Sequence, residues 1–349
     1  MKAVVLYGPH NVSVGELPLP PMGDGDVKVK VAYCGLCGSD FHKVAGKKNT
    51  HPVKYPVALG HEISGVVAEV GKGVTQFKVG DRVTVNPNWA CGKCRYCKVG
   101  KPSFCENGRG VVKGIAEYVV SPEENVHHLP DRLSLKTAAL TEPLACCLRG
   151  VDLLDVKAGD SVALIGFGAI GAIMLQLLRK SGAGEIAVIE YNKDRKDLAL
   201  KLGADVFFAS SEKDAIEKYA SERIIDRVIE CVGNSAAHET ALVVAGRGAT
   251  VVMFGVADSS AKTDVSFYDA FSKELTIKTS FINPHTTERA IRILALGALD
   301  IESTISAELT MEEAAEEFLS PNHSRKGKVL VLVDPSLENS PCLCPLSVI

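Results

Sequence analysis

The sequence lacks the long apolar stretches, one-sided charge and regular repeats that mark several protein classes. No apolar run approaches the ~18 residues of a membrane span, and residues 1–6 are too short and wrongly flanked for a signal peptide. Lysine and arginine together number 39 against 42 acidic residues, and no long basic run occurs. No fixed-period repeat or low-complexity tract is present. We therefore expect a cytoplasmic protein that binds neither membranes nor nucleic acid.

The chain has 349 residues, which is too long for one ordinary hydrophobic core, so two domains are expected. It contains eleven cysteines. In a long chain without an export signal, metal binding is a better first explanation for them than disulfide bonds.

A glycine-rich turn near the middle of the chain carries the strongest local signal. The apolar run Ser161–Ile165 leads into Gly166-Phe167-Gly168-Ala169-Ile170-Gly171, and a helix-compatible run follows over residues 169–181. In such a G-x-G-x-x-G unit the glycines permit the tight turn, the approach of a pyrophosphate and close packing of helix on strand. The phosphates then lie at the helix N-terminus.

The chain downstream of this turn supports a dinucleotide site. A second apolar run ends at Glu190, about 20 residues on, where a ribose-binding acid is expected. Strand-like runs then alternate with helix-compatible ones, which is typical of a doubly wound parallel sheet. The predicted strands are 205–209, 227–231, 249–254 and 275–281, and the predicted helices are 194–202, 213–222 and 236–245. A nucleotide-free α/β domain with a glycine-rich loop is the alternative.

The expected cofactor is NAD, because a carboxylate at residue 190 would repel the 2′-phosphate of NADP. Arg195 lies nearby and could instead be a phosphate clamp, although a basic residue at this distance can also stack on adenine. The full set of predicted cofactor-binding residues is Gly166, Gly168, Ala169, Ile170, Gly171, Glu190, Arg195, Val232, Phe254, Gly255, Ser280 and Phe281.

Four cysteines in a polar loop have the spacing of a structural zinc site. They follow the pattern C-x2-C-x2-C-x7-C and are Cys91, Cys94, Cys97 and Cys105. Two-residue gaps let successive thiolates converge on one tetrahedral ion, and the fourth thiolate closes the shell. Because a closed all-sulfur shell leaves no room for water, this zinc should be structural.

A second constellation mixes cysteine, histidine and carboxylate. It consists of Cys37, Ser39, Asp40 and His42, then His61-Glu62, then Glu142. A zinc ion with three protein ligands of these kinds keeps an open position for substrate, as catalysis requires. Cys34 and Cys37 could also form a redox pair or half of a zinc knuckle, but the apolar residues before Cys34 favour a buried thiol.

Together these motifs resemble the zinc-dependent medium-chain alcohol dehydrogenases over nearly the whole chain. Glu142 and the segment 280–284 look most like the sorbitol, polyol and polyol-phosphate branch. The resemblance implies an α/β protein in which a Rossmann domain, residues 147–280, is inserted into a mainly-β GroES-like catalytic domain, residues 1–146 and 281–349. Residues 335–349 read as a poorly ordered extension. Proteins of this branch are usually homodimers or homotetramers.

The resemblance also assigns roles. Cys37, His61 and Glu142 look like the catalytic zinc ligands, with Glu62 an alternating ligand or a nearby carboxylate. Asp40 resembles the acid that orients the liganded histidine. Ser39 resembles the hydroxyl that takes the substrate proton, and His42 could pass that proton to solvent. Alternatively, Ser39 and Asp40 could cap a helix, His42 could be a surface imidazole, and Glu62 could be a strand-end charge.

The implied reaction is hydride transfer between a secondary alcohol of a polyol or polyol phosphate and NAD, giving the ketose, with two zinc ions per chain. An enzyme like L-threonine 3-dehydrogenase is one alternative. A non-catalytic, nucleotide-sensing zinc protein is another, and it would keep the glycine turn and the four clustered cysteines but lose the open site. The joint presence of Cys37, Ser39, His61 and Glu142 favours the enzyme.

Overall fold

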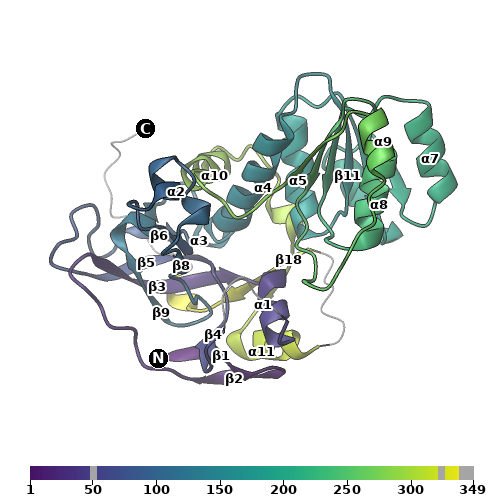
Figure 1. The fold of residues 1–349 in the computed structure, drawn as a ribbon. Coiled ribbons are helices and arrows are strands. Elements are labelled where there is room, and N and C mark those ends of the chain that lie inside the picture. Colours follow the sequence, from purple (N-terminus) through teal and green to yellow (C-terminus); the bar gives the residue numbers. More distant parts are fainter. Residues whose placement is uncertain (48–52, 321–326, 338–349) are drawn as a thin grey trace. The chain divides into compact units, whose positions relative to one another are not determined.

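The computed structural model describes residues 1–47, 53–320 and 327–337, and the chain divides into two compact units (Figure 1). The first unit comprises residues 1–145, 284–298 and 305–349, and the second comprises residues 146–283 and 299–304. Most of the predicted C-terminal extension, residues 338–349, lies outside the described residues. No helix in the described ranges is long and apolar enough to cross a membrane.

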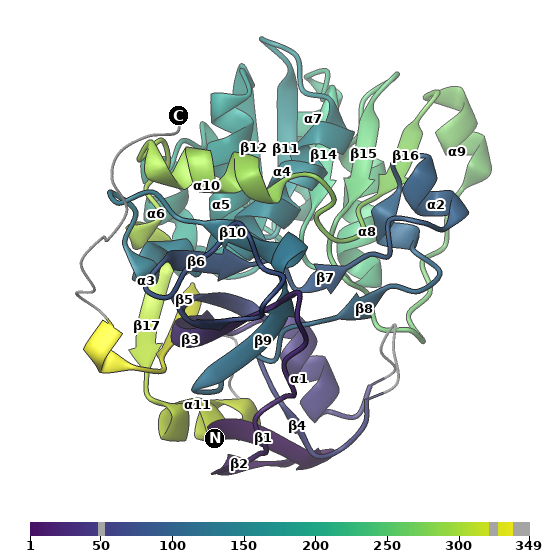
Figure 2. The same ribbon diagram turned by 90° about the vertical axis from the view of Figure 1, so that its left-hand side faces the viewer.

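The second unit contains a six-stranded, fully parallel sheet in the order β13-β12-β11-β14-β15-β16, of which the part from β12 to β16 can be followed in Figure 2. Its strands are β11 (Ser161–Ile165), β12 (Glu185–Glu190), β13 (Val206–Ala209), β14 (Arg227–Glu230), β15 (Thr250–Met253) and β16 (Thr276–Thr279). Its helices are α5 (Ala169–Lys180), α6 (Lys196–Lys201), α7 (Lys213–Ser221), α8 (Ser235–Val244) and α9 (Phe267–Ser272). Counted along the chain, the strand order is 3-2-1-4-5-6, the doubly wound order of dinucleotide-binding sheets.

Burial of the sheet on both faces explains why its central strands could be recognised as apolar runs in the sequence. Helices cover both faces of the sheet, with α5 on one and α8 on the other (Figure 1). The central strand β11 is buried from Val162 to Ile165. Strands enclosed in this way carry nearly continuous apolar runs rather than an alternating pattern. The predicted doubly wound parallel sheet is therefore confirmed.

The first unit is mainly β, as expected. A seven-stranded sheet has the order β10-β6-β5-β3-β18-β17, with β9 also paired to β3, and β2-β1-β4 and β7-β8 form two smaller sheets. The strands are β1 (Lys2–Gly8), β2 (Asn11–Glu16), β3 (Asp26–Gly35), β4 (Val57–Ala58), β5 (Glu62–Val70), β6 (Arg82–Val85), β7 (Asn88–Trp89), β8 (Arg109–Gly110), β9 (Tyr118–Pro122), β10 (Val126–His128), β17 (Ile305–Leu309) and β18 (Lys328–Leu332). The helices are α1 (Gly38–Val44), α2 (Arg95–Lys98), α3 (Leu135–Ala138), α10 (Thr287–Ala295) and α11 (Met311–Leu319). Helix α4 (Thr141–Leu154) begins in this unit and ends in the other.

Two strand pairings bring distant segments to one place in the first unit. Strand β5 pairs antiparallel with β3, which sets Glu62 opposite Gly35. Strand β18, which returns after the inserted unit, pairs with the other edge of β3 and sets Leu330 opposite Gly35. The C-terminal end of β3 therefore meets the beginnings of β5 and β18, and helix α1 starts just beyond it.

Candidate active site and nucleotide site

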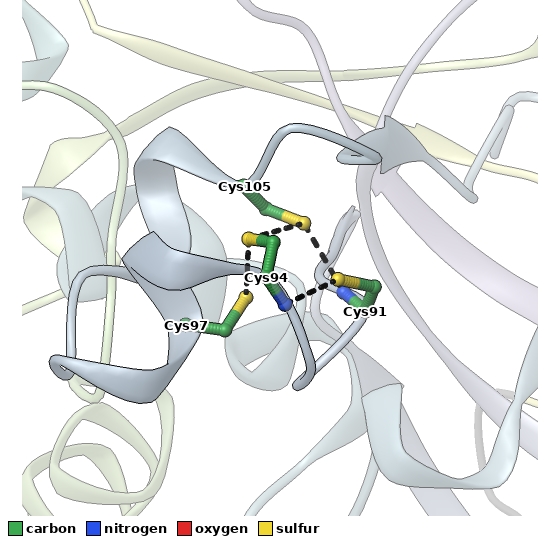
Figure 3. A group of neighbouring side chains, drawn as sticks. All are labelled: Cys91, Cys94, Cys97 and Cys105. Carbon is green, nitrogen blue, oxygen red and sulfur yellow. Dashed lines mark hydrogen bonds between the residues drawn. The ribbon is translucent and has the colours of Figure 1, made fainter.

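The four clustered cysteines surround one point, with their sulfurs facing inward (Figure 3). Cys94 Sγ lies 3.6 Å from Cys97 Sγ and 3.9 Å from Cys105 Sγ. These separations are too long for disulfides, and none of the four cysteines forms one. Four sulfurs bonded tetrahedrally to zinc at ~2.3 Å stand about 3.8 Å apart. The cluster therefore has the spacing that a closed zinc site needs.

Hydrogen-bond donors around the cluster favour thiolate at one of its members. The Asn107 amide and the backbone N–H groups of Lys93 and Cys94 point at Cys91 Sγ, at 3.4–3.6 Å, and lower the pKa of Cys91 to about 6. A thiol that loses its proton near neutral pH is a ready metal ligand.

A second, mixed group of potential metal ligands lies where β3, α1 and β5 meet. One ligand atom from each of Cys37, His61 and Glu62 lies within 4.8 Å of the other two. Cys37 immediately precedes α1, and the β3–β5 pairing places it near His61 and Glu62. Thiolate, imidazole and carboxylate together form a donor set suited to zinc, and three protein ligands leave a coordination position for another group.

Asp40 holds the imidazole of this group. It is fully buried, and its Oδ2 lies 3.3 Å from His61 Nδ1 while its Oδ1 accepts a 2.8 Å hydrogen bond from Lys43. Burial alone would raise the pKa of Asp40, but His61 and Lys43 lower it well below its usual value. With Nδ1 engaged by Asp40, Nε2 is the ring nitrogen available to a metal.

Ser39 and Asp40 lie inside the first turn of α1, whose N-cap is Cys37, so the helix-capping interpretation of these two residues is wrong. The Ser39 hydroxyl donates to Cys37 Sγ at 3.4 Å, which places it beside the mixed ligand group. His42 lies on the same helix, and its role in proton transfer stays a prediction.

Glu62 is 1% exposed and is paired with Lys328, whose side chain is 3% exposed. Lys328 Nζ also donates to the Leu36 carbonyl at 2.7 Å. Burial raises the pKa of Glu62, and the nearby charge of Glu142 adds to this effect while Lys328 opposes it. Glu62 is therefore not a solvent-exposed charge at the end of a strand. Sequence reasoning missed Lys328 as its partner, because a lysine at the start of a strand is usually exposed to solvent.

Glu142 lies near the mixed ligand group without belonging to it. Glu142, in the first turn of α4, is 9% exposed; it is close enough to act on Glu62, although the group within 4.8 Å does not include it. Its ligand role stays a prediction.

Cys34 is fully buried on β3 and burial raises its pKa, so the expectation of a buried thiol is confirmed.

In the second unit, the glycine turn has the contacts that the fingerprint requires. Gly166 adopts φ 88°, and a Cβ atom there would lie 2.5 Å from Val232 Cγ2. A Cβ atom on Gly171 would lie 2.1 Å from the Gly166 carbonyl oxygen, so helix α5 can pack here only on glycine. At Gly168 the nearest atom to a Cβ would be 3.6 Å away, which leaves the backbone approachable. Ala169 and Ile170 begin α5.

Glu190 ends β12 beside this turn. Its carboxylate accepts the Phe167 N–H at 2.6 Å and the Asn192 N–H at 2.9 Å, and Arg195 approaches it at 3.4 Å. Arg195 also donates to the Phe167 carbonyl at 3.0 Å. The predicted acid and base are thus both attached to the middle of the glycine turn.

The other predicted cofactor residues follow later strands of the same sheet. Val232 follows β14, Phe254 and Gly255 follow β15, and Ser280 and Phe281 follow β16. Ligands of open parallel sheets bind at the carboxyl ends of the strands, where all five residues lie. Sequence reasoning missed Glu230, the last residue of β14, whose carboxylate and main-chain carbonyl accept hydrogen bonds from the turns that follow β14 and β15.

Comparison with known proteins agrees with this geometry. Residues 23–131 match the alcohol dehydrogenase GroES-like domain, and residues 169–295 match the zinc-binding dehydrogenase domain. Sorbitol dehydrogenase of Bacillus subtilis is 30% identical over 96% of this chain and 98% of its own length. D-arabitol-phosphate dehydrogenase of Enterococcus avium is 33% identical over 92% of this chain and 93% of its own length. The crystal structure of a zinc-binding dehydrogenase from Sinorhizobium meliloti 1021 bound to NADP superposes with a TM-score of 0.89 at 36% identity, covering 95% of this chain and 98% of that one.

Proposed function

The chain belongs to the zinc-dependent medium-chain alcohol dehydrogenase family, and we propose that it oxidises a secondary alcohol of a polyol or polyol phosphate to the ketose with NAD as acceptor. The observation that carries the proposal is the mixed group of Cys37, His61 and Glu62 with Asp40 behind its imidazole. Two relatives that match nearly the whole chain are named sorbitol dehydrogenase and D-arabitol-phosphate dehydrogenase, which favours polyols over L-threonine.

We propose two zinc ions per chain. Cys91, Cys94, Cys97 and Cys105 would hold one ion in a closed shell, and Cys37, His61 and Glu62, with Glu142 as the alternative carboxylate, would hold the other. A zinc ion bound by the mixed group supplies a Lewis acid that lowers the pKa of an alcohol oxygen. Metal analysis that gave fewer than two zinc ions per chain would contradict this count.

The chain's own groups would then manage the proton and the geometry. Asp40 keeps the His61 ring oriented through Nδ1. The Ser39 hydroxyl, 3.4 Å from Cys37 Sγ, would accept the alcohol proton, and His42 would pass it on to solvent. The hydride would leave for the nicotinamide of a cofactor bound at the glycine turn.

Glu190 supports NAD over NADP. Two backbone N–H groups fix its carboxylate at the end of β12, where it would meet a 2′-phosphate as a like charge. The related Sinorhizobium structure is bound to NADP, so the preference of this chain for NAD needs a direct test. Replacing Glu190 with serine should lower catalytic efficiency with NAD and raise it with NADP. Equal efficiencies with the two cofactors in the wild-type protein would contradict the assignment.

We also propose that the protein is a homodimer or homotetramer whose subunits meet at α9 and the sheet edge β16. On α9 the side chains of Phe267 and Phe271 are each 82% exposed, and Ile277 on β16 is 42% exposed. Large apolar side chains gathered on one surface are typical of subunit interfaces.

Assays on a panel of polyols, polyol phosphates and L-threonine, followed by cofactor reduction, test the reaction. Cys37→Ala should abolish turnover. Cofactor binding should persist because the glycine turn lies in the other unit, and the four-cysteine zinc site should persist because it shares no ligand with the mixed group. Cys34→Ala is the matched control, since Cys34 is a neighbouring thiol outside the ligand group. Near-normal rates in Cys37→Ala would show that the metal site is wrongly assigned.

A further inference from the structure

Glu230 is a buried carboxylate that none of the proposed chemistry uses. It is the last residue of β14, it is 0% exposed, and it lies at the carboxyl edge of the parallel sheet, where the glycine turn also lies. Burying a carboxylate is costly unless strong hydrogen bonds compensate. Its contacts therefore indicate what it is there to hold.

The carboxylate contacts the turn that follows β14, whereas the turn that follows β15 is bonded to the main-chain carbonyl of Glu230, as it would be with any residue at this position. The carboxylate Oε1 accepts the N–H groups of Val232 and Gly233, at 2.5 and 2.7 Å. The Glu230 carbonyl oxygen accepts the N–H groups of Phe254 and Gly255, at 2.8 and 2.9 Å. Three of these four donors are residues predicted from the sequence to contact the cofactor.

The turn held by the Glu230 carboxylate also packs against the glycine fingerprint and against the turn that follows β15. Val232 Cγ2 would lie 2.5 Å from a Cβ on Gly166, and a Cβ on Gly255 would lie 2.2 Å from the Gly233 nitrogen. The backbones are thus packed with no room for side chains. A small rotation of the Val232–Gly233 turn would change the surface offered beside Gly166.

Helix α8 places a histidine beside the carboxylate. Its other oxygen, Oε2, lies 3.5 Å from His238 Nε2 on α8, and His238 Nδ1 lies 2.8 Å from Thr263 Oγ1. Ser235 at the start of α8 also donates to the Lys262 carbonyl at 2.7 Å. The segment around residue 263 is in this way linked through His238 to Glu230.

We propose that Glu230 is a positioning residue for the dinucleotide, and that His238 and Thr263 hold its carboxylate in place. This inference rests on the proposed function, because it assumes that a dinucleotide binds at the glycine turn. Fixing the Val232–Gly233 turn before the ligand arrives lowers the entropy lost on binding. Charge-assisted hydrogen bonds to N–H groups are about twice as strong as neutral ones, which explains a carboxylate where an amide would fit.

The test compares Glu230→Gln with Asp226→Asn. Asp226 flanks the opposite end of β14 and accepts the Ser161 N–H at 2.9 Å, so its variant probes a carboxylate–backbone contact away from the proposed site. NADH and NADPH dissociation constants are measured by fluorescence titration, together with kcat, zinc content and melting temperature. We expect Glu230→Gln to weaken binding of the preferred cofactor about tenfold, the effect of neutralising a charged acceptor. Its kcat at saturating cofactor and its zinc content should stay within about twofold of wild type, and Asp226→Asn should lower the melting temperature only.

His238→Ala provides a second variant should Glu230→Gln fail to fold, and it should weaken cofactor binding several-fold. A wild-type dissociation constant in folded Glu230→Gln, or in His238→Ala where only that variant folds, would overturn the positioning role while leaving the proposed function intact. Failure of the wild-type chain to bind either NADH or NADPH would instead overturn the proposed function and, with it, this inference.

Discussion

Replacing Lys328 by methionine removes the ammonium group that lies against Glu62 while keeping a side chain of similar length. The two side chains are 3% and 1% exposed, so neither charge can be solvated by bulk water. Removing one partner of a buried ion pair costs about 3–5 kcal/mol, because the other charge stays buried and unpaired. We expect a loss of this size in the free energy of unfolding of the first unit in the metal-free protein.

Zinc should reverse most of that loss. Glu62 belongs to the ligand group with Cys37 and His61, so a bound dication would neutralise the carboxylate that Lys328 no longer pairs with. Because the ion neutralises a carboxylate that is already paired in the wild type but unpaired in Lys328→Met, its stabilisation of the variant should exceed its stabilisation of the wild type. The prediction therefore concerns the difference between zinc-loaded and metal-free protein as well as the metal-free value.

Urea unfolding followed by circular dichroism, with and without zinc, measures both quantities. Lys28→Met is the matched control, because Lys28 pairs with Glu69 on the same sheet but Glu69 is 55% exposed. Exposed pairs contribute about 0–1 kcal/mol. If metal-free Lys328→Met lost no more stability than Lys28→Met, the buried pair would not hold Glu62 and the reasoning would be refuted.

Three further changes test other parts of the structure. Burial raises the pKa of Asp334, but hydrogen bonds from Lys30 and Ser336 lower it below its usual 3.8. The stabilisation by these bonds is therefore present above that pH and is lost as the pH falls. The difference of about 1 kcal/mol in unfolding free energy between wild type and Asp334→Asn should shrink in acid, and a difference independent of pH would contradict the assignment. Gly171→Ala should weaken cofactor binding in fluorescence titration, since its Cβ would meet the Gly166 carbonyl at 2.1 Å, and unchanged binding would count against the fingerprint site. Glutamate at both Phe267 and Phe271 should lower the mass found by sedimentation, whereas Leu296→Glu, at a residue 67% exposed on the first unit, should leave it unchanged.

The parallel sheet and the four-cysteine site could be predicted because their signals are local. The central strands of the sheet, β11 and β12, contain short apolar runs, and the cysteines lie within 15 residues of one another along the chain. Strand ends were less predictable: the run 275–281 forms a strand only over Thr276–Thr279, and the chain turns at Ile282 with φ 47°. Phe281, the apolar residue beyond the end of this strand, is 42% exposed, so its apolar character does not mark membership of the sheet.

The pairing of Glu62 with Lys328 had no local signal. It depends on β18 returning after the inserted unit and lying against β3 with Leu330 opposite Gly35. That register brings the first residue of β18 to the Leu36 carbonyl and the Glu62 carboxylate. In the sequence, the same lysine stands at the start of a strand, where a charge is usually solvated.

Glu230 did have a signal, which becomes legible only once the strand order is known. The tripeptide Val-Ile-Glu ends both β12, at Glu190, and β14, at Glu230. These two strands flank β11 on either side, so both carboxylates reach the same edge of the sheet as the glycine turn. Each accepts the N–H of the residue two positions on, Asn192 in one case and Val232 in the other. The distance along the chain from the glycine fingerprint identifies only Glu190 as a cofactor-binding acid. Glu230 is recognised as its counterpart only when β12 and β14 are known to pair in parallel with the two edges of β11.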